Sequence, residues 1–293
     1  MTAVGIANGL TLEYETFGDP ADPTVLLVSG FGSQLRSWPL PMCTRIADAG
    51  RFVIRFDNRD AGLSSQLDDH PVDGAELARA GREGGRAAVR ELAPYTLSDM
   101  AADAIQLLDA LGIDRAHVVG ASMGGMVAQT MAIEHPDRLL TLTSIMSTTG
   151  ERDYGQSTPE AQAALLRPRP TDREGYIESA DRNLVYLSKR YGTVEWARRN
   201  AAADYDRAFR PAGTQRQLAA IMASGSRADG LRALRVPTLV IHGLDDTLIQ
   251  PSGGERTAEL VPDARLLLVA DMGHDRPDEL CADLADAIVA HTA

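Results

Sequence analysis

Residues 116–129, AHVVGASMGGMVAQ, decide the fold that we expect for this chain. The opening residues are apolar and favour a strand, and the closing residues favour a buried helix. Between them, residues 120–124 (GASMG) fit the pattern G-x-S-x-G, which carries little information alone but much between a strand and a helix. A turn this sharp strains the serine backbone and needs small neighbours, which Gly120 and Gly124 supply. We therefore predict that Ser122 is a nucleophile.

Strands and helices alternate on both sides of this turn. Short β-rich apolar runs predict strands at residues 25–28, 52–56, 116–119, 139–145, 238–241 and 266–269, and residues 10–17 alternate in the manner of an edge strand. Apolar spacing and helix signals predict helices at residues 38–49, 96–112, 123–135 and 278–291. This alternation predicts an α/β fold, with a mostly parallel sheet covered by helices on both faces.

Two segments interrupt the alternation. Residues 149–234 are rich in Ala, Arg and Asp, with helix starts at Thr158 and Thr193, and we expect a helical cap insertion. The core would then comprise residues 1–148 and 235–293 and form one structural unit with the cap. Residues 66–94 are a smaller insertion, in which the central GREGG suggests a mobile loop.

Composition narrows the class of protein. The chain has 293 residues, 44% of them hydrophobic and 24% charged, as expected for a globular protein with a sizeable core. Its net charge of -12 argues against a nucleic-acid or anionic-membrane partner, because both need a positive face. The N-terminus lacks the pattern of a secretory signal, and no apolar run approaches the ~20 residues of a membrane span. We expect a cytoplasmic protein with buried thiols at Cys43 and Cys281.

A serine hydroxyl needs a base to accept its proton. His274 is the best candidate, because ADMGH (residues 270–274) follows the last predicted strand and can overhang the turn at Ser122. His117 and His242 lie in or at the end of strands, where packing or backbone-bonded roles are usual. The remaining histidines occupy loops or helix ends, where solvation is usual: His70, His135 and His291.

The third catalytic group should be a carboxylate on the loop after the preceding strand. Residues 242–246 (HGLDD) offer Asp245 and Asp246, and only one of them can orient the imidazole. The oxyanion of an acyl-transfer reaction also needs two backbone N–H donors. Met123 is one candidate, because it follows the nucleophile at a helix start. Phe31 is the other, in the turn SGFG of residues 29–32.

Five segments occur in the order found in α/β-hydrolases: VLLVSGFGSQ, VIRFDNRDAGLSS, AHVVGASMGGMVAQ, VPTLVIHGLDDTLI and DMGH. The chain most resembles the branch that contains aclacinomycin methylesterase and mycobacterial lipase/esterase-type proteins. In that family the triad acid is the third residue after the strand-end glycine, which favours Asp246 here and leaves Asp245 as the alternative. The family pattern also places an oxyanion donor at Phe31. Many members carry His-Gly before that donor, whereas this chain has Ser29-Gly30.

The resemblance implies a serine esterase that cleaves small to medium, largely apolar esters through an acyl-enzyme, with no metal or organic cofactor. The alternatives on the same residues are thioester or lactone cleavage and perhydrolysis, and a ligand-binding protein on a hydrolase fold is a less favoured alternative. Arg59, in the family-like run of residues 57–60, is expected to form a structural ion pair. Trp196, Phe209 and Met222 are apolar candidates for the substrate pocket. The sequence leaves the oligomeric state open.

Overall fold

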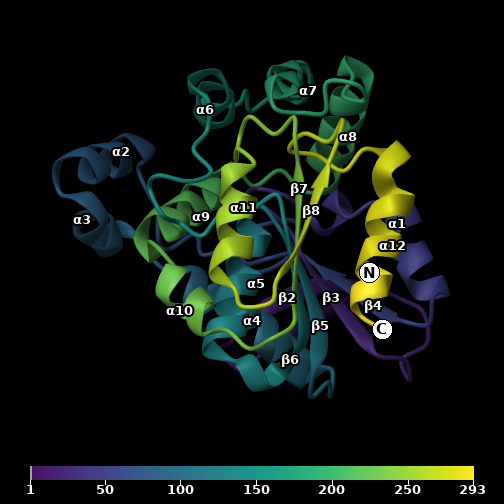
Figure 1. Ribbon diagram of the computed structural model, residues 1–293. Helices are drawn as coiled ribbons and strands as arrows, with labels where there is room; N and C mark the ends of the chain where they lie inside the picture. The colour runs from purple at the N-terminus through teal and green to yellow at the C-terminus, as the bar shows by residue number, and fades with distance from the viewer. Residues whose placement is uncertain (1) are drawn as a thin grey trace.

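The computed structural model describes residues 2–293. A single eight-stranded sheet forms the centre of the molecule (Figure 1). The strands follow the order β1-β2-β4-β3-β5-β6-β7-β8. Their bounds are β1 Thr2–Gly5, β2 Thr11–Phe17, β3 Thr24–Val28, β4 Phe52–Phe56, β5 Ala116–Ala121, β6 Leu139–Ile145, β7 Thr238–Gly243 and β8 Arg265–Val269. From β4 to β8 all neighbours are parallel, and β2 pairs antiparallel with both β1 and β4. The predicted α/β class is confirmed.

Helices cover both faces of the sheet. Their bounds are α1 Leu40–Asp48, α2 Gly74–Glu83, α3 Gly85–Leu92, α4 Leu97–Ala110, α5 Met123–Glu134, α6 Pro159–Leu166, α7 Arg173–Glu178, α8 Val194–Arg207, α9 Pro211–Ser224, α10 Ala228–Ala233, α11 Ser252–Leu260 and α12 Cys281–His291. Short 3-10 helices lie at Leu35–Ser37, Pro136–Arg138, Ser179–Val185 and Asp278–Leu280. Helices α1 and α12 pack together on one face, while α4 and α5 pack on the other.

Strand β3 shows why the sheet needs two layers of helices. All five of its residues are buried. Leu26 and Val28 join the apolar cluster that contains α4 and α5, whereas Val25 and Leu27 join the cluster that contains α1 and α12. Side chains alternate across a strand, so a run that is apolar at every position is stable only when both faces are covered.

The segment between β6 and β7 contains helices α6 to α10 and no strand. Figure 1 shows α6, α7 and α8 beyond the carboxyl ends of the strands, while α9 and α10 lie beside the sheet. The predicted helix starts are confirmed: the Thr158 hydroxyl accepts from the N–H of Ala161, and the Thr193 hydroxyl accepts from that of Trp196. Such bonds satisfy donors that a helix start leaves free.

Three expectations for the fold were wrong or incomplete. Strand β2 is not the edge of the sheet, because β1 pairs with its outer side. The expected mobile loop in residues 66–94 contains α2 and α3, which meet at Gly84 and pack Leu77 and Val89 against α9. Helix α11 was not predicted, because adjacent glycines in its first turn disfavour a helix. In residues 2–293 no helix combines the length and the apolar character needed to cross a membrane.

Candidate active site

Ser122 occupies the turn between β5 and α5 with backbone angles φ 57° and ψ -122°. This conformation is rare for a residue with a side chain and costs free energy that the surrounding packing must offset. The packing leaves no room for larger neighbours. A Cβ on Gly120 would overlap the backbone of Gly124, and a Cβ on Gly124 would overlap the carbonyl of Val28. The turn therefore presents Ser122 at the carboxyl edge of the sheet.

A chain of hydrogen bonds links three side chains that are distant in sequence. His274 Nε2 lies 2.9 Å from Ser122 Oγ, and His274 Nδ1 lies 2.7 Å from Asp246 Oδ2. Asp246 follows β7, and His274 follows β8. Because these strands are parallel neighbours of the same sheet, their carboxyl-end loops meet beside Ser122. The three groups are thus arranged for proton transfer from hydroxyl to imidazole, with the carboxylate orienting the ring.

Asp246 is held as a buried anion. Its other oxygen, Oδ1, accepts hydrogen bonds from the N–H groups of Leu248 and Ile249, both at 2.9 Å. Burial by itself would raise the pKa of the Asp246 carboxyl, but the charge of His274 and hydrogen bonds from His242 and His274 hold that pKa below its usual value. Asp246 is therefore ionised at neutral pH and can stabilise a protonated imidazole.

Asp245 has different surroundings. Its carboxylate forms an ion pair with Lys189 at 3.2 Å, and the Lys189 side chain is 74% exposed. Its backbone N–H donates to the carbonyl of Met272. The structure thus brings Asp246, and not its neighbour, to the imidazole of His274.

The two candidate oxyanion donors belong to segments that adjoin the serine. Met123 is the first residue of α5, where backbone N–H groups have no intrahelical acceptor. Phe31 follows Gly30, and a Cβ on Gly30 would lie 3.3 Å from Ser122 Cβ and 3.8 Å from Ser122 Oγ. The turn that carries Phe31 therefore approaches the nucleophile closely because residue 30 has no side chain.

Gln217 of α9 was missed by sequence reasoning. It is fully buried, and its Oε1 accepts the N–H of Gly32 at 2.8 Å while its Nε2 donates to the carbonyl of Arg59 at 2.9 Å. It thus joins the turn that carries Phe31 to the loop after β4. No local pattern marks such a residue, because the bond to Gly32 spans 185 positions of the chain.

His242 also contacts the site. Its Nε2 lies 2.7 Å from the carbonyl of Ile249 and 3.5 Å from Asp246 Oδ2, so it packs behind the carboxylate and away from Ser122. His117 contacts Thr141 inside the sheet, and burial lowers its pKa to about 4. The backbone-bonded and packing roles expected of these two histidines are confirmed.

Arg59 forms the expected structural ion pair, with Nε 2.5 Å from Asp103 Oδ2 and both side chains buried. Cys43 and Cys281 are free and buried, as expected, and burial raises the pKa of each thiol to about 11. Thiols with such values are almost wholly protonated at neutral pH and are poor nucleophiles. Among the described residues, no group of three or more His, Cys, Asp and Glu side chains could hold a metal ion.

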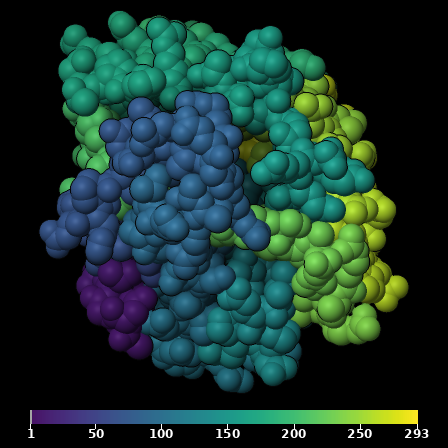
Figure 2. All heavy atoms as spheres, turned by 90° about the vertical axis from the view of Figure 1, so that its left-hand side faces the viewer, coloured from purple at the N-terminus to yellow at the C-terminus, as the bar shows by residue number. Residues whose placement is uncertain are grey.

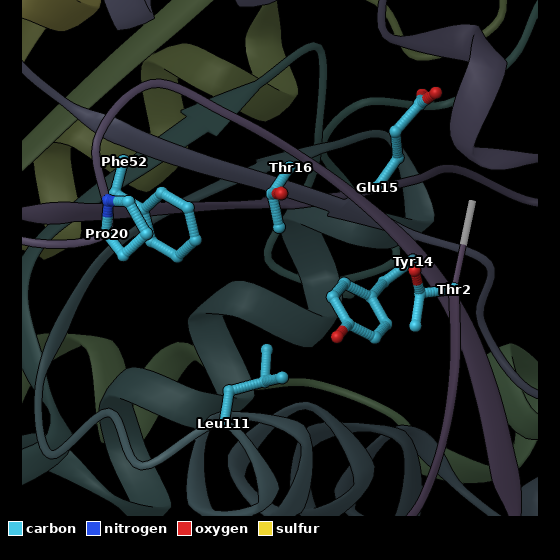
Figure 3. Close-up of a pocket in the computed structure, with 7 residues that line it drawn as sticks. All are labelled: Thr2, Tyr14, Glu15, Thr16, Pro20, Phe52 and Leu111. Atoms are coloured by element: carbon cyan, nitrogen blue, oxygen red, sulfur yellow. The ribbon is translucent and has the colours of Figure 1, made fainter.

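Two cavities lie in different parts of the molecule. One, of about 460 Å³, lies between α3, the segment after β6 and the end of α9, and Met126 and Met222 line it. Figure 2 shows a hollow between the blue α2–α3 region and the teal segment after β6. The other, of about 470 Å³, is lined by residues of β1, β2 and β4 together with Pro20 and Leu111 (Figure 3). The lining of neither cavity includes any of the three linked side chains. Of the three residues expected in the substrate pocket, only Met222 lines either cavity. Trp196 packs within the apolar cluster of α6 to α8, and Phe209 stacks on Tyr205.

Comparison with known proteins agrees with this architecture. The family model described as alpha/beta hydrolase fold matches residues 23–277. Rhodomycin D methylesterases are similar over 97% of this chain and 95% of their own length, at 31% identity for Streptomyces sp. (strain C5) and 30% for Streptomyces peucetius. The enol-lactonase from Burkholderia xenovorans LB400 superposes with a TM-score of 0.74 at 21% identity, covering 99% of both chains. The chain therefore belongs to the α/β hydrolase fold family, as an esterase-type member.

Proposed function

We propose that this protein is a serine hydrolase that cleaves carboxylic esters through an acyl-enzyme, with Ser122, His274 and Asp246 as its catalytic triad. One observation carries the proposal: the hydrogen-bond chain of 2.9 Å and 2.7 Å that joins the three side chains. The strained backbone of Ser122 and the ionised state of Asp246 support it. A ligand-binding protein would need neither a strained serine nor a buried carboxylate behind a histidine.

The reaction begins when Ser122 Oγ attacks the ester carbonyl carbon and its proton passes to His274 Nε2. Asp246 stabilises the imidazolium, and the N–H groups of Phe31 and Met123 donate to the oxyanion. When the tetrahedral intermediate collapses, the C–O bond to the alcohol breaks and the alkoxide takes the proton from His274. A water molecule then loses a proton to His274 and attacks the acyl carbon. When this second tetrahedral intermediate collapses, the bond between the acyl carbon and Ser122 Oγ breaks, Oγ takes the proton back from His274, and the acid is released.

The substrate is a small to medium, largely apolar ester that enters beneath a cap formed by residues 149–234. Met126 and Met222 in the cavity wall suit such a substrate, because methionine packs against varied apolar shapes. The similarity to two methylesterases favours esters over thioesters, lactones and perhydrolysis, which the same triad also permits. A panel of p-nitrophenyl esters of graded chain length, assayed beside acyl thioesters and lactones, separates these activities.

The Ser122→Ala variant tests the nucleophile. We expect kcat to fall by a factor on the order of 10³ or more, because the acyl-enzyme cannot form. The loss of one oxygen leaves the apolar core intact, so circular dichroism should show a folded protein. Phenylmethylsulfonyl fluoride should inactivate the wild type, whereas iodoacetamide should not, since both thiols are buried and protonated. An unchanged rate in Ser122→Ala would refute the triad.

A further inference from the structure

The cavity of about 460 Å³ combines an apolar lining with an unusual concentration of positive charge. Met126, Ile221 and Met222 form apolar parts of its wall, and three arginines also line it: Arg86, Arg152 and Arg227. Its volume lies within the usual range for small-molecule sites. The whole chain carries a net charge of -12, so a cluster of three guanidinium groups is a local departure from its overall charge.

Arg227 is a buried cation without a carboxylate partner. Its donors bond to neutral acceptors only: Gln129 Oε1 at 3.0 Å and the carbonyl oxygens of Thr148 at 2.8 Å and Gly225 at 3.2 Å. Burial lowers the pKa of Arg227 to about 10, so the group is still charged at neutral pH. Because buried charges are usually paired, this one leaves a positive potential in the cavity wall.

Arg86 and Arg152 stand at the exposed mouth of the same cavity. Among the described residues, no Asp or Glu oxygen lies within 4.0 Å of either guanidinium group. Arg86 reaches from α3 across the end of α9, where its Nη1 would collide with a Cβ on Gly225. Glu151 also lines the cavity, but its two oxygens are each 3.0 Å from Arg256. The one acidic side chain of the lining is therefore already paired.

The inner wall of the cavity lies close to the proposed nucleophile. Met126 N–H donates to the carbonyl of Ser122 at 3.1 Å, and the rise of a helix separates the two Cα atoms by roughly 6 Å along the axis. On the other side, Thr148 follows Ser147, whose hydroxyl donates to the same Ser122 carbonyl at 2.8 Å. Ser122 itself does not line the cavity, so an acyl chain attached at Ser122 Oγ would have to extend past Met126 to reach the arginines.

We propose that this cavity is an anion subsite, and that the preferred substrates are esters whose acyl chain ends in a carboxylate, such as half-esters of aliphatic dicarboxylic acids. Guanidinium groups bind carboxylates by paired hydrogen bonds, and the methionines pack on the intervening methylene groups. The inference rests on the proposed function, since it assigns the substrate class of the same site. The distal carboxylate is bound and takes no part in bond breaking.

The test compares two esters of equal acyl length, mono-p-nitrophenyl adipate and p-nitrophenyl hexanoate. We expect the wild type to hydrolyse the anionic ester with at least tenfold higher kcat/KM, and this preference should shrink as salt is added. The double variant Arg86→Gln/Arg152→Gln should lose tenfold or more in kcat/KM for the adipate ester, mainly through KM. Its kcat/KM for the hexanoate ester should stay within twofold of the wild-type value.

Arg90→Gln is the control for the loss of one positive charge from α3, because Arg90 is exposed and does not line the cavity. This variant should hydrolyse both esters with kcat/KM within twofold of the wild-type values. The anion subsite would be overturned if kcat/KM for the adipate ester were no higher than for the hexanoate ester. It would also be overturned if Arg90→Gln and the double variant lost kcat/KM for the adipate ester equally. In either case, turnover of the hexanoate ester would still support the esterase.

A binding measurement decides the subsite even if neither ester is hydrolysed. Monomethyl adipate and methyl hexanoate are titrated calorimetrically into the Ser122→Ala variant, with and without Arg86→Gln/Arg152→Gln. A Kd for monomethyl adipate that rises tenfold on loss of the two arginines, with no such rise for methyl hexanoate, supports the subsite. Equal Kd values in both proteins overturn it. The absence of any turnover by the wild type would count against the proposed function only.

Discussion

Asp245 and Asp246 are adjacent and chemically identical, yet they have opposite surroundings. Asp246 is buried, accepts two backbone N–H groups and contacts the imidazole of His274, whereas Asp245 pairs with exposed Lys189. An exposed ion pair contributes little free energy, because solvent screens it and the side chains lose freedom. The same charge therefore contacts the imidazole at one position and pairs with an exposed cation at the next.

The two asparagine variants test this difference. Asp246→Asn should lower kcat by several orders of magnitude, since an amide permits the wrong imidazole tautomer and cannot stabilise its charge. About 10⁴ is the reference value for the same change in another triad. Asp245→Asn should lower kcat by less than tenfold. Steady-state kinetics measures kcat for both variants, with circular dichroism as the folding control. If Asp245→Asn is inactive and Asp246→Asn is active, the triad acid is Asp245 instead of Asp246.

The two histidines near Asp246 are separated by a second pair of variants. His274→Ala should abolish most activity, because the base is lost. His242→Ala should retain much of it, because His242 contacts the carboxylate of Asp246 but lies away from Ser122. For the wild type, kcat/KM should fall on the acid side, since only an unprotonated imidazole accepts the serine proton. Equal losses in the two variants would mean that the base is wrongly assigned.

At the scale of elements, helix α9 positions a loop of the core. Gln217 bonds to Gly32 and to the carbonyl of Arg59, and it thereby holds the turn that presents Phe31 to the proposed oxyanion. A mispositioned donor weakens transition-state binding more than substrate binding. The segment between β6 and β7 thus contributes to the geometry of the candidate site.

Gln217→Leu removes both hydrogen bonds while keeping an apolar side chain in the buried position. We expect kcat to fall by roughly tenfold with KM nearly unchanged, as for the loss of an interaction made in the transition state. Gln215→Leu, on the same helix, is the matched control and should leave kcat within twofold. A rise in KM at constant kcat would show instead that Gln217 shapes substrate binding.

At the scale of the whole molecule, the loop of His274 is bonded to the segment between β6 and β7. His274 N–H donates to the carbonyl of Tyr186, and Asp275 Oδ1 accepts the N–H of Ser188 at 2.9 Å. Asp275 Oδ2 is buried without a hydrogen-bond partner. Burial raises the pKa of the Asp275 carboxyl to about 6, so the folded protein binds this proton more tightly than the unfolded chain does.

The sign of the stability effect follows from that pKa. Because the folded value lies above the unfolded value, the stability contributed by protonated Asp275 is present at low pH and is lost as pH rises from about 4 through about 6. Asp275→Asn keeps an acceptor for Ser188 and removes the charge. Its free energy of unfolding relative to wild type should therefore increase between pH 4 and pH 7, by at most about 3 kcal/mol.

Urea unfolding of wild type and Asp275→Asn across this pH range measures the difference. Asp278→Asn is the control, because Asp278 is 62% exposed and should show a difference that does not follow the same pH range. A difference between Asp275→Asn and wild type that is independent of pH would contradict the assigned cause.

The sequence by itself determined the α/β class, most strands and the helix starts at Thr158 and Thr193. These features depend on neighbours: alternation along a strand, spacing along a helix, or a hydroxyl that bonds to the next turn. The turn at Ser122 has a local signature, because Gly120 must fit against the backbone of Gly124, although Gly124 must also fit against Val28 of the distant strand β3. Helix α11 was not predicted from the sequence, because its glycines have a low helix propensity, which tertiary packing overrides.

Without reference to a family, only the tertiary structure decided which aspartate reaches His274. Only the tertiary structure also decided the positions of Gln217 and of the three arginines. Each of these depends on the direction of a side chain or on contacts between distant residues, as between Gln217 and Gly32. Adjacent residues of a loop point to different partners, and composition does not say which. Proximity across the carboxyl edge of a sheet arises only when the strands have assembled, and for that reason the charge of the cavity cannot be read from the order of residues.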